Sequence, residues 1–200
     1  MPIPFLEENP DPVHILNIST HMDKTLKALT EKTPQSTKAI IYTISQDTLL
    51  ENMQVRYGPN HHVYGQYAQA GPPIGRVHFH FISSKMELNV HGRDFVMKRR
   101  SPIGGHYFTY PGVNEMQWKS SSLVGSGLKL VDCHGRMIAC TKKSMMRHVM
   151  GSGPSAIHIF DRIDDGFLMD LIVVTGLAAI EYRRQSDEAW GWMKEATGGA

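Results

Sequence analysis

Histidine is the most prominent chemically active residue type in this sequence, with 11 copies among 200 residues. His78 and His80 lie two positions apart in RVHFHF. In a strand both imidazoles point to one face, and the apolar residues around them point to the other. A His-x-His pair can bind a metal, but a tight site needs a third or fourth ligand, and the sequence does not show which residue would supply it. We therefore predict histidines that face solvent or form hydrogen bonds, and no metal site.

Asp170 is the one charge inside the long apolar run FLMDLIVVTGLAA, residues 167–179. One interpretation places this carboxylate in the first turns of a helix, where the helix dipole or an arginine from a strand stabilises it. The other interpretation makes it a proton-handling group whose pKa is raised by an apolar site. The sequence leaves both open.

Motifs for catalysis or cofactor binding are scarce. The chain contains no Walker loop, no GxGxxG after a strand, no HExxH and no GxSxG. An enzyme of this sequence would therefore work without metal or cofactor, by holding an apolar substrate in a reactive shape. Aromatic rings would shape the substrate, and a histidine or aspartate would move a proton. The candidate catalytic residues are His78, His80, Tyr107, Trp118, His158 and Asp170.

Two basic clusters could contact the phosphate groups of a lipid headgroup, although such clusters are usually solvated surface. The candidate anion-binding or lipid-binding residues are Lys98, Arg99, Arg100, Lys142, Lys143 and Arg147. The whole chain carries 21 Lys and Arg against 19 Asp and Glu, a net charge of +2. This small excess does not favour nucleic acid as a partner.

The apolar run predicts a buried C-terminal helix. It is shorter than the roughly 20 residues of a membrane span, and Asp170 would be costly in lipid. Asp164 or Asp165 suits the start of a helix, and Arg183 and Arg184 suit its end. Because apolar residues occupy every side of this helix, other parts of the protein must surround it.

Short alternating segments separated by Gly, Pro and Asn predict about eleven strands between residues 39 and 163. They are 39–44, 52–57, 63–68, 76–82, 85–90, 93–100, 106–110, 114–121, 127–133, 136–143 and 156–163. Many strands followed by one buried helix indicate a closed antiparallel barrel, because such a barrel surrounds the helix and leaves no exposed strand edge. The predicted fold class is therefore mainly β.

The two ends of the chain are predicted to lie outside the barrel domain of residues 37–185. Residues 1–36 form an N-terminal extension, in which apolar positions of 14–31 predict a short helix packed on the barrel. Residues 186–200 form a tail whose Trp190 and Trp192 we expect to pack on the barrel.

The N-terminus has no basic start followed by an apolar core, so we expect a cytoplasmic protein rather than a secreted one. Cys133 and Cys140 lie in LKLVDCHGRMIAC, a predicted hairpin that turns at His134-Gly135. That register separates the two sulfurs by about 13 Å, so both are predicted to be free thiols.

The order of strands, the hairpin LKLVDCHGRMIAC and the helix ending in EYRR resemble the tubby C-terminal-like superfamily, which includes phospholipid scramblases and LURP-one-related proteins. The runs YTISQD, GRVHFHF, RDFVMKRR and MQWKSSSLVGSG are similar to a fungal branch of that fold, known only as a domain of unknown function. The resemblance covers roughly residues 39–185. It implies a barrel of about 12 strands around a hydrophobic helix and, in some members, binding of phosphoinositides or anionic membrane surfaces.

Two function classes follow. The first is a noncatalytic module of a fungal protein that binds an apolar small molecule or a lipid. The second is a cofactor-independent cyclase or isomerase of the pericyclase kind, in fungal natural-product biosynthesis, which acts on an apolar substrate. A cavity of roughly several hundred Å³ beside the central helix, with convergent polar groups, would favour a ligand or catalysis, whereas a filled barrel would favour binding at the surface.

Overall fold

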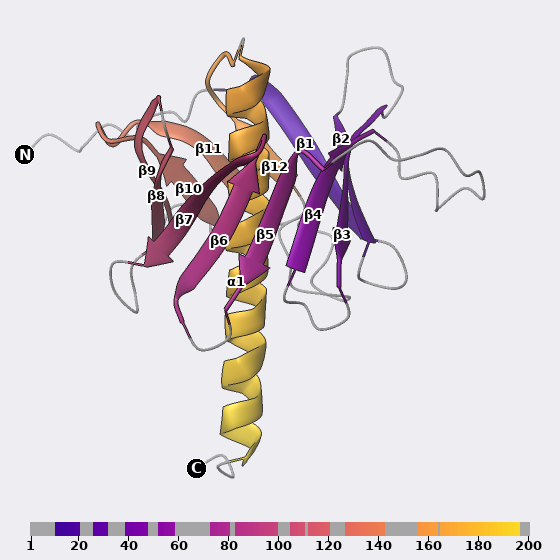
Figure 1. Ribbon diagram of the computed structural model, residues 1–200, viewed down its shortest axis with the longest axis vertical. Helices are drawn as coiled ribbons and strands as arrows, with labels where there is room; N and C mark the ends of the chain where they lie inside the picture. Colours follow the sequence, from indigo (N-terminus) through magenta and orange to yellow (C-terminus); the bar gives the residue numbers. More distant parts are fainter. Residues whose placement is uncertain are drawn as a thin grey trace, which may run out of the picture.

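The computed structural model describes residues 11–20, 26–31, 39–47, 52–58, 73–80, 83–99, 105–110, 112–120, 127–142, 156–163 and 165–196. Twelve strands and one helix occur in this part of the chain (Figure 1). The strands are β1 His14–Thr20, β2 Leu26–Glu31, β3 Ala39–Gln46, β4 Asn52–Tyr57, β5 Gly75–Phe79, β6 Lys85–Val90, β7 Arg93–Arg99, β8 His106–Tyr110, β9 Val113–Ser120, β10 Leu128–Val131, β11 Met137–Lys142 and β12 Ala156–Ile159. The helix, α1, spans Gly166–Ala196.

The strands form one closed antiparallel barrel in which each strand pairs with its neighbours in the sequence. The barrel closes where β1 pairs with both β2 and β12, with His14 opposite Ile159 and Asn17 opposite Ala156. Closure satisfies the backbone groups that an open sheet would expose at its edges. The prediction of a mainly β, closed antiparallel barrel of about 12 strands is therefore confirmed.

Alternation along the strands directs apolar side chains into the barrel. In β6, Met86, Leu88 and Val90 are buried, whereas Lys85 and Glu87 are exposed. Because successive strand residues point to opposite faces, this period of two separates the interior from the outer surface. The buried side chains of the strands and of α1 form one continuous hydrophobic core.

Helix α1 runs through the barrel and projects beyond the strands at one end (Figure 1). Four successive residues, Ile172 to Thr175, are fully buried, and four residues in a row cover every side of a helix. The helix begins after Asp165, whose side chain accepts a hydrogen bond from the Phe167 backbone N–H at 2.9 Å. The buried C-terminal helix and its aspartate cap are confirmed, whereas the predicted helix end at Arg183 and Arg184 is wrong, because α1 continues to Ala196.

The N-terminal helix predicted for residues 14–31 is wrong, because this region forms β1 and β2. Its apolar residues fit a helical spacing, but Leu16 and Ile18 also fit a period of two, and both are buried in the barrel. Without β1, the strands β12 and β2 would both lose a pairing partner. Closing the barrel therefore outweighs the local helical pattern, and residues 14–31 belong to the barrel domain.

Two other predictions concern the tail and one strand. Helix α1 extends to Ala196, so most of the predicted tail is helical, while the side chains of Trp190 and Trp192 lie outside the described residues. The predicted strand 63–68 also lies outside them. In the hairpin of β10 and β11, Lys129 pairs with Cys140, and both cysteines are free thiols, as predicted.

Within the described part of the chain, no helix has the length and apolar content needed to cross a membrane.

Gly75 is where β5 approaches the helix most closely. A Cβ atom at this position would overlap the Val174 side chain, with Cγ1 at 2.9 Å. We expect Gly75→Ala to lower the free energy of unfolding by about 2 kcal/mol, because a stiff β-branched side chain cannot move aside. Urea unfolding measures this loss.

The matched control is the double variant Gly75→Ala with Val174→Ala, in which the removed methyl groups make room for the new one. It should be more stable than the sum of the single changes predicts, by at least 0.5 kcal/mol. Simple additivity would contradict the placement of α1 against β5.

Candidate functional site

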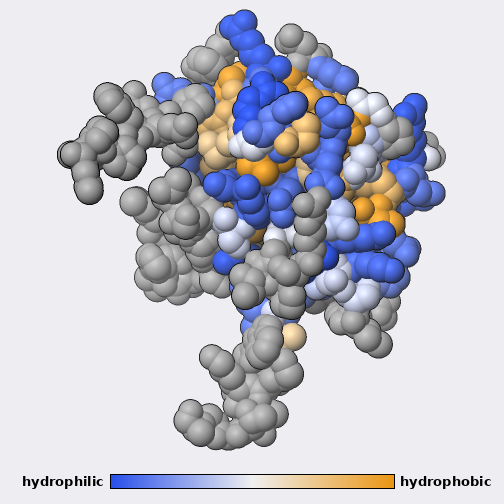
Figure 2. Space-filling view, turned by 90° about the vertical axis from the view of Figure 1, so that its left-hand side faces the viewer, coloured by the Kyte–Doolittle hydropathy of each residue, from blue (hydrophilic) through white to orange (hydrophobic). Residues whose placement is uncertain are grey.

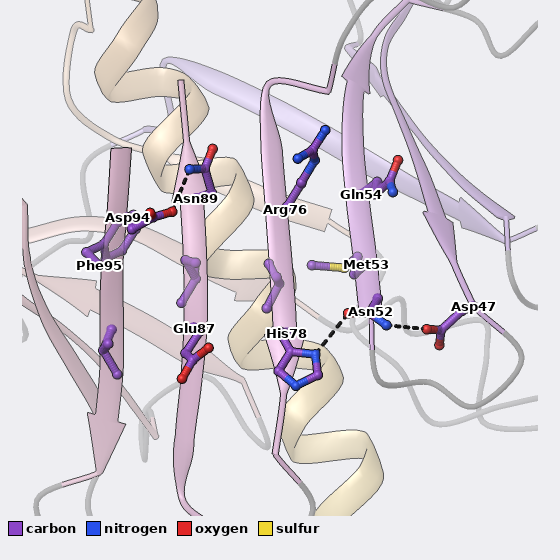
Figure 3. A pocket seen from close by; sticks show the side chains of 13 residues that line it. Asp47, Asn52, Met53, Gln54, Arg76, His78, Glu87, Asn89, Asp94 and Phe95 are labelled. Atoms are coloured by element: carbon purple, nitrogen blue, oxygen red, sulfur yellow. Dashed lines mark hydrogen bonds between the residues drawn. The ribbon is translucent and has the colours of Figure 1, made fainter. Parts of the chain in front are cut away.

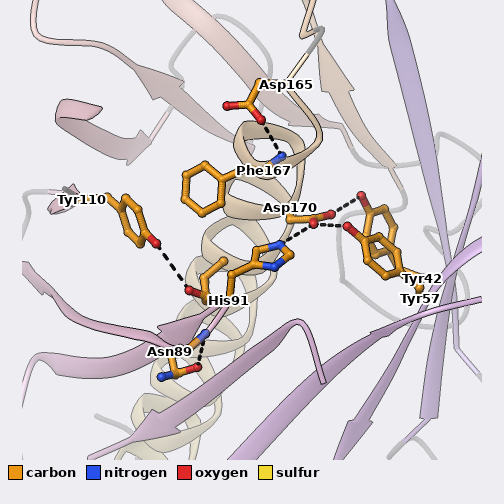
Figure 4. A network of polar contacts seen from close by, with 10 residues as sticks. Tyr42, Tyr57, Asn89, His91, Tyr110, Asp165, Phe167 and Asp170 are labelled. Carbon is orange, nitrogen blue, oxygen red and sulfur yellow. Dashed lines mark hydrogen bonds and ion pairs between the residues drawn. The ribbon is translucent and has the colours of Figure 1, made fainter. Parts of the chain in front are cut away.

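Four polar side chains meet at the end of the barrel where α1 begins (Figure 4). Tyr42 donates a hydrogen bond to Asp170 Oδ1 at 2.8 Å, and His91 Nε2 lies 2.7 Å from Asp170 Oδ2. The Tyr57 hydroxyl donates to the same Oδ2. We call Tyr42, Tyr57, His91 and Asp170 the Asp170 cluster.

Three different parts of the barrel supply the Asp170 cluster. Tyr42 and Tyr57 are opposite each other on β3 and β4, and their ring centroids lie 5.6 Å apart. His91 belongs to the turn between β6 and β7, and Asp170 lies in the first turns of α1. The helix therefore presents its carboxylate to side chains that the pairing of β3 through β7 brings to one end of the barrel.

His91 has an unusual backbone conformation. Its φ is 49° and that of Gly92 is 77°, so this two-residue turn resembles type I′, which requires positive φ at both positions. Asparagine or glycine is usual there, and a histidine in the left-handed region carries strain. The Gly92 N–H donates to Asn89 Oδ1 at 3.1 Å, and the His91 N–H donates to the Ile74 carbonyl at 2.9 Å. These bonds hold the turn so that the imidazole reaches Asp170.

The Asp170 cluster combines a buried carboxylate with donors that reach the surface. Asp170 is 1% exposed, whereas the His91 side chain is 39% exposed and Tyr57 is 55% exposed. Although much of the Tyr57 ring is exposed, its hydroxyl is turned toward Asp170. Desolvation of this hydroxyl, its hydrogen bond to Asp170 and the charge of that carboxylate all raise the pKa of Tyr57 above its usual value. Tyr57 is therefore a hydrogen-bond donor at physiological pH.

Aromatic side chains lie beside the Asp170 cluster. The Phe167 ring lies 5.7 Å from the His91 ring and 4.7 Å from the Tyr110 ring, measured between centroids. The Arg93 guanidinium lies over the Tyr110 ring, 5.9 Å from its centroid. The end of the barrel thus places apolar ring surface next to a hydrogen-bonded carboxylate and imidazole.

The contact between Asp170 and His91 is suited to proton transfer. A carboxylate that accepts from one ring nitrogen orients the imidazole and fixes which nitrogen carries the proton. The second ring nitrogen, Nδ1, has no hydrogen-bond partner among the described residues. His91 could therefore exchange a proton with a bound molecule, with Asp170 as the group that positions it.

A second buried carboxylate lies toward the opposite end of the barrel. Glu181 is 1% exposed and accepts hydrogen bonds from Gln46 at 3.2 Å and from Arg184 Nε at 2.9 Å. These partners come from β3 and from the next turn of α1. Because the Arg184 charge compensates that of Glu181, this group is an anchor for the helix.

His106 lies near that end of the barrel and is only 7% exposed. Its ring packs edge-on against Tyr182 at 4.6 Å, and its Nε2 has no hydrogen-bond partner among the described residues. Desolvation, together with the nearby Arg99 charge, lowers the pKa of His106 from 6.5 to about 4. The imidazole is therefore neutral in the folded protein at pH 7.

Acid should destabilise the protein partly through His106. Between pH 6.5 and about 4 the unfolded chain binds a proton at this residue that the folded chain does not, so stability falls as the pH falls through this range. One unit of pKa shift corresponds to about 1.4 kcal/mol, so the shift from 6.5 to about 4 sets an upper limit of about 3.5 kcal/mol on this loss of stability. We expect His106→Leu to abolish the part of this acid-induced loss of stability that comes from His106. Urea unfolding at pH 7, 5.5 and 4 measures the free energy of unfolding of both proteins.

His158 also has a pKa lowered by desolvation and by Lys142, so the measured quantity is the difference between the variant and the unmodified protein. An equal loss of stability in both proteins would show that His106 is protonated in the folded state.

The predicted catalytic residues do not come together. His78 lies on β5 and His80 directly follows this strand, and their ring centroids lie 4.6 Å apart, so the two imidazoles are neighbours as expected. His78 contacts Asn52 at 2.9 Å, and His80 contacts Glu87 at 3.1 Å. Both pairs lie on the outside of the barrel, away from Asp170.

The other candidates are also dispersed. Trp118 is fully buried inside the barrel and donates its indole N–H to Thr175 at 3.0 Å, which makes it a core residue. Tyr107 is half-buried on β8, opposite Lys98 of β7. His158 lies on β12 between Cys140 and Ile15 of the neighbouring strands. Of the six candidates, Asp170 belongs to the cluster, and its partners are tyrosines and a histidine rather than an arginine.

The basic candidates are divided as well. Lys98 is exposed, whereas the neighbouring Arg99 lies over the Tyr182 ring at 5.7 Å. Lys142 is exposed on β11, separated from β7 by three strands. Arg100, Lys143 and Arg147 lie outside the described residues.

On the side of the barrel that carries β8 and β9, hydrophilic residues alternate with apolar patches (Figure 2).

A metal-binding group does not occur in the described part of the chain: no three His, Cys, Asp or Glu side chains there are placed to hold an ion.

Sequence reasoning missed Tyr42, Tyr57 and the role of His91. One signal was present, because a turn that requires positive φ usually contains asparagine or glycine, and NVHGRD has histidine instead. The two tyrosines carry no such signal, since aromatic residues are common in strands.

Comparison with known proteins adds no relative, because no family model, curated protein or solved structure matches the chain.

Proposed function

We propose that this protein binds an apolar small molecule or a lipid at the end of the barrel where α1 begins, with the Asp170 cluster as the polar part of the site. One observation carries the proposal: a carboxylate that is 1% exposed accepts three hydrogen bonds, two of them from side chains that reach the surface. Binding sites typically combine apolar walls with a few convergent polar groups of this kind. Phe167, which is half-buried, supplies apolar surface, and the buried Tyr110 ring packs against it.

The strain at His91 also supports this proposal. Non-glycine residues are held in the left-handed region mainly where the surrounding structure requires their side chain at a particular place. A turn with asparagine would avoid the strain, but its shorter side chain would not reach Asp170.

The test is native mass spectrometry of the full chain after incubation with lipid extracts and, separately, with metabolite extracts. His91→Asn keeps a residue that tolerates positive φ and removes the imidazole. We expect it to weaken capture of the bound molecule at least tenfold. The matched control is His134→Asn in the hairpin of β10 and β11, where the same tripeptide HGR occurs and the histidine is exposed. Equal capture by both variants would refute the proposal.

A second candidate function is cofactor-independent proton transfer, as in an isomerase or cyclase. The contact between Asp170 and His91 favours this function, because His91 Nδ1 has no hydrogen-bond partner among the described residues. Exchange of carbon-bound hydrogen of the captured molecule in D2O is the measurement. Tyr57→Phe should keep some binding, whereas a variant such as His91→Gln should lose the exchange. Binding without any hydrogen exchange would support the binding function and contradict the catalytic one.

We also propose kinship with the tubby C-terminal-like superfamily and its fungal branch. A twelve-stranded closed barrel around a C-terminal helix is the architecture that this resemblance implies, and it supports the proposal.

A further inference from the structure

A groove lies on the outer surface of the barrel, over β4, β5, β6 and β7, with a volume of about 760 Å³ (Figure 3). Outward-facing side chains line it in two rows across the strands. One row contains Asn52, His78 and Glu87; the other contains Gln54, Arg76, Asn89 and Asp94. Polar and charged side chains of four strands therefore face this groove, and none of the residues of the Asp170 cluster lines it.

Arg76 lies in the middle of the groove and forms no hydrogen bond or ion pair with the described residues. Its direct cross-strand neighbours are the neutral amides Gln54 and Asn89. Each of these amide oxygens already accepts one hydrogen bond, Gln54 Oε1 from Arg56 at 2.8 Å and Asn89 Oδ1 from the Gly92 N–H. The five N–H donors of this guanidinium are therefore available to a ligand, and they suit a carboxylate or phosphate.

The groove also carries negative charge. Asp47, Glu87 and Asp94 line it together with Arg76, so the carboxylates outnumber the arginine. Asp94 accepts from Asn89 through Oδ1, and Glu87 contacts His80 through Oε1, which leaves one oxygen of each available. A purely anionic ligand at Arg76 would be repelled by these groups. A ligand with both an oxyanion and an ammonium group would pair the oxyanion with Arg76 and the ammonium group with a carboxylate.

Spacing favours the same conclusion. Glu87 is diagonal to Arg76 across β5 and β6, at a Cα distance of about 7–8 Å for such pairs. Asp94 lies in the same row as Arg76, two strands away, which corresponds to about 10 Å. These distances allow one small molecule to reach the guanidinium with one end and a carboxylate with the other.

A chain of hydrogen bonds fixes the orientation of His78. Asn52 donates through Nδ2 to Asp47 at 2.6 Å, so its Oδ1 faces His78 and accepts from His78 Nδ1 at 2.9 Å. In the neutral ring Nε2 is then an acceptor. It can receive an N–H or O–H of the ligand, next to Arg76 on the same strand.

We propose that this groove is a binding site for a small zwitterion, with its carboxylate or phosphate on Arg76 and its ammonium group on Glu87 or Asp94. Free amino acids and phosphoethanolamine share this chemistry. The site is independent of the function proposed for the Asp170 cluster.

The experiment is titration of the isotope-labelled full chain, followed by backbone amide NMR. The probes are L-glutamine and O-phosphoethanolamine, which are zwitterions, with N-acetyl-L-glutamine, which lacks the ammonium group, and L-glutamine methyl ester, which lacks the carboxylate. We expect at least one zwitterion to shift amides of β4–β7, and both single-charge probes to bind at least tenfold more weakly. A response to only one zwitterion identifies the source of the oxyanion.

Matched variants test the residues. Arg76→Gln should weaken binding at least tenfold and Glu87→Gln should weaken it several-fold, whereas Arg162→Gln, an exposed arginine outside the groove, should have no effect. His91→Asn should leave this binding unchanged, which separates it from the Asp170 cluster. The proposal is overturned if neither zwitterion shifts these amides, if a single-charge probe binds equally well, or if Arg76→Gln binds normally.

Discussion

Replacing Asp170 with leucine should lower the free energy of unfolding by about 3 kcal/mol. The substitution removes a buried carboxylate and leaves its donors behind, which costs more than replacing a whole buried pair. Part of the cost arises at Tyr42, because this side chain is 3% exposed and its hydroxyl loses the Asp170 acceptor. Tyr57 and His91 are partly exposed and can turn to solvent. Urea unfolding at pH 7 measures the change.

Two variants separate this explanation from a simple packing defect. Asp170→Asn keeps the shape and one acceptor oxygen, so it should cost about 1 kcal/mol. Adding Tyr42→Phe to Asp170→Leu removes the hydroxyl that has lost the Asp170 acceptor, and the double variant should be more stable than the sum of the single changes predicts. If the two changes add instead, Tyr42 and Asp170 are not coupled, and the Asp170 cluster is not a connected network.

The barrel and its helix were predictable because their signals are local. Alternation in segments such as KMELNV indicates a strand whatever lies beside it, and an apolar run with an aspartate before it indicates a buried, capped helix. The strands β1 and β2 were missed because their apolar residues fit two periods. What decides between the two is the free-energy cost of leaving β12 and β2 without pairing partners. This cost depends on the arrangement of the whole sheet, so a local sequence pattern does not show it.

The Asp170 cluster was predictable only at Asp170 itself. Its partners are 128, 113 and 79 residues away in the chain, and only the register of the closed barrel brings them to one place. The two HGR turns illustrate the limit. His91 has positive φ and contacts Asp170, whereas at the second turn Asp132 Oδ1 accepts from the His134 and Arg136 N–H groups, and glycine alone has positive φ. The same tripeptide therefore adopts two conformations, which its neighbours decide.

The two buried carboxylates of α1 also explain how the helix keeps one position in the barrel. Asp170 and Glu181 are 11 residues apart, which corresponds to about 16 Å along a helix. Each bonds to a different level of β3, through Tyr42 and through Gln46. Apolar contacts alone would tolerate rotation or sliding of the helix, whereas these directional bonds fit one placement.

Trp118 should be the most costly core residue to truncate, with Trp118→Ala lowering the free energy of unfolding by about 4 kcal/mol. The ring is fully buried between β9 and α1, and its N–H donates to Thr175. Trp118→Phe keeps most of the apolar volume and loses the hydrogen bond, so it should cost about 2 kcal/mol. Urea unfolding of the two variants separates the cavity from the lost bond.

Gly176 provides a sharper test of this contact, because the effect of one substitution should change sign. A Cβ atom at Gly176 would lie 3.0 Å from Trp118 Cζ2 and 3.2 Å from Cη2, so Gly176→Ala should destabilise the protein by about 1 kcal/mol in the presence of the ring. In the Trp118→Ala background the space is open, and the same change should stabilise it by about 1 kcal/mol, since alanine favours a helix more than glycine does. Destabilisation in both backgrounds would mean that something other than Trp118 requires the glycine, and the packing of β9 on α1 would have to be revised.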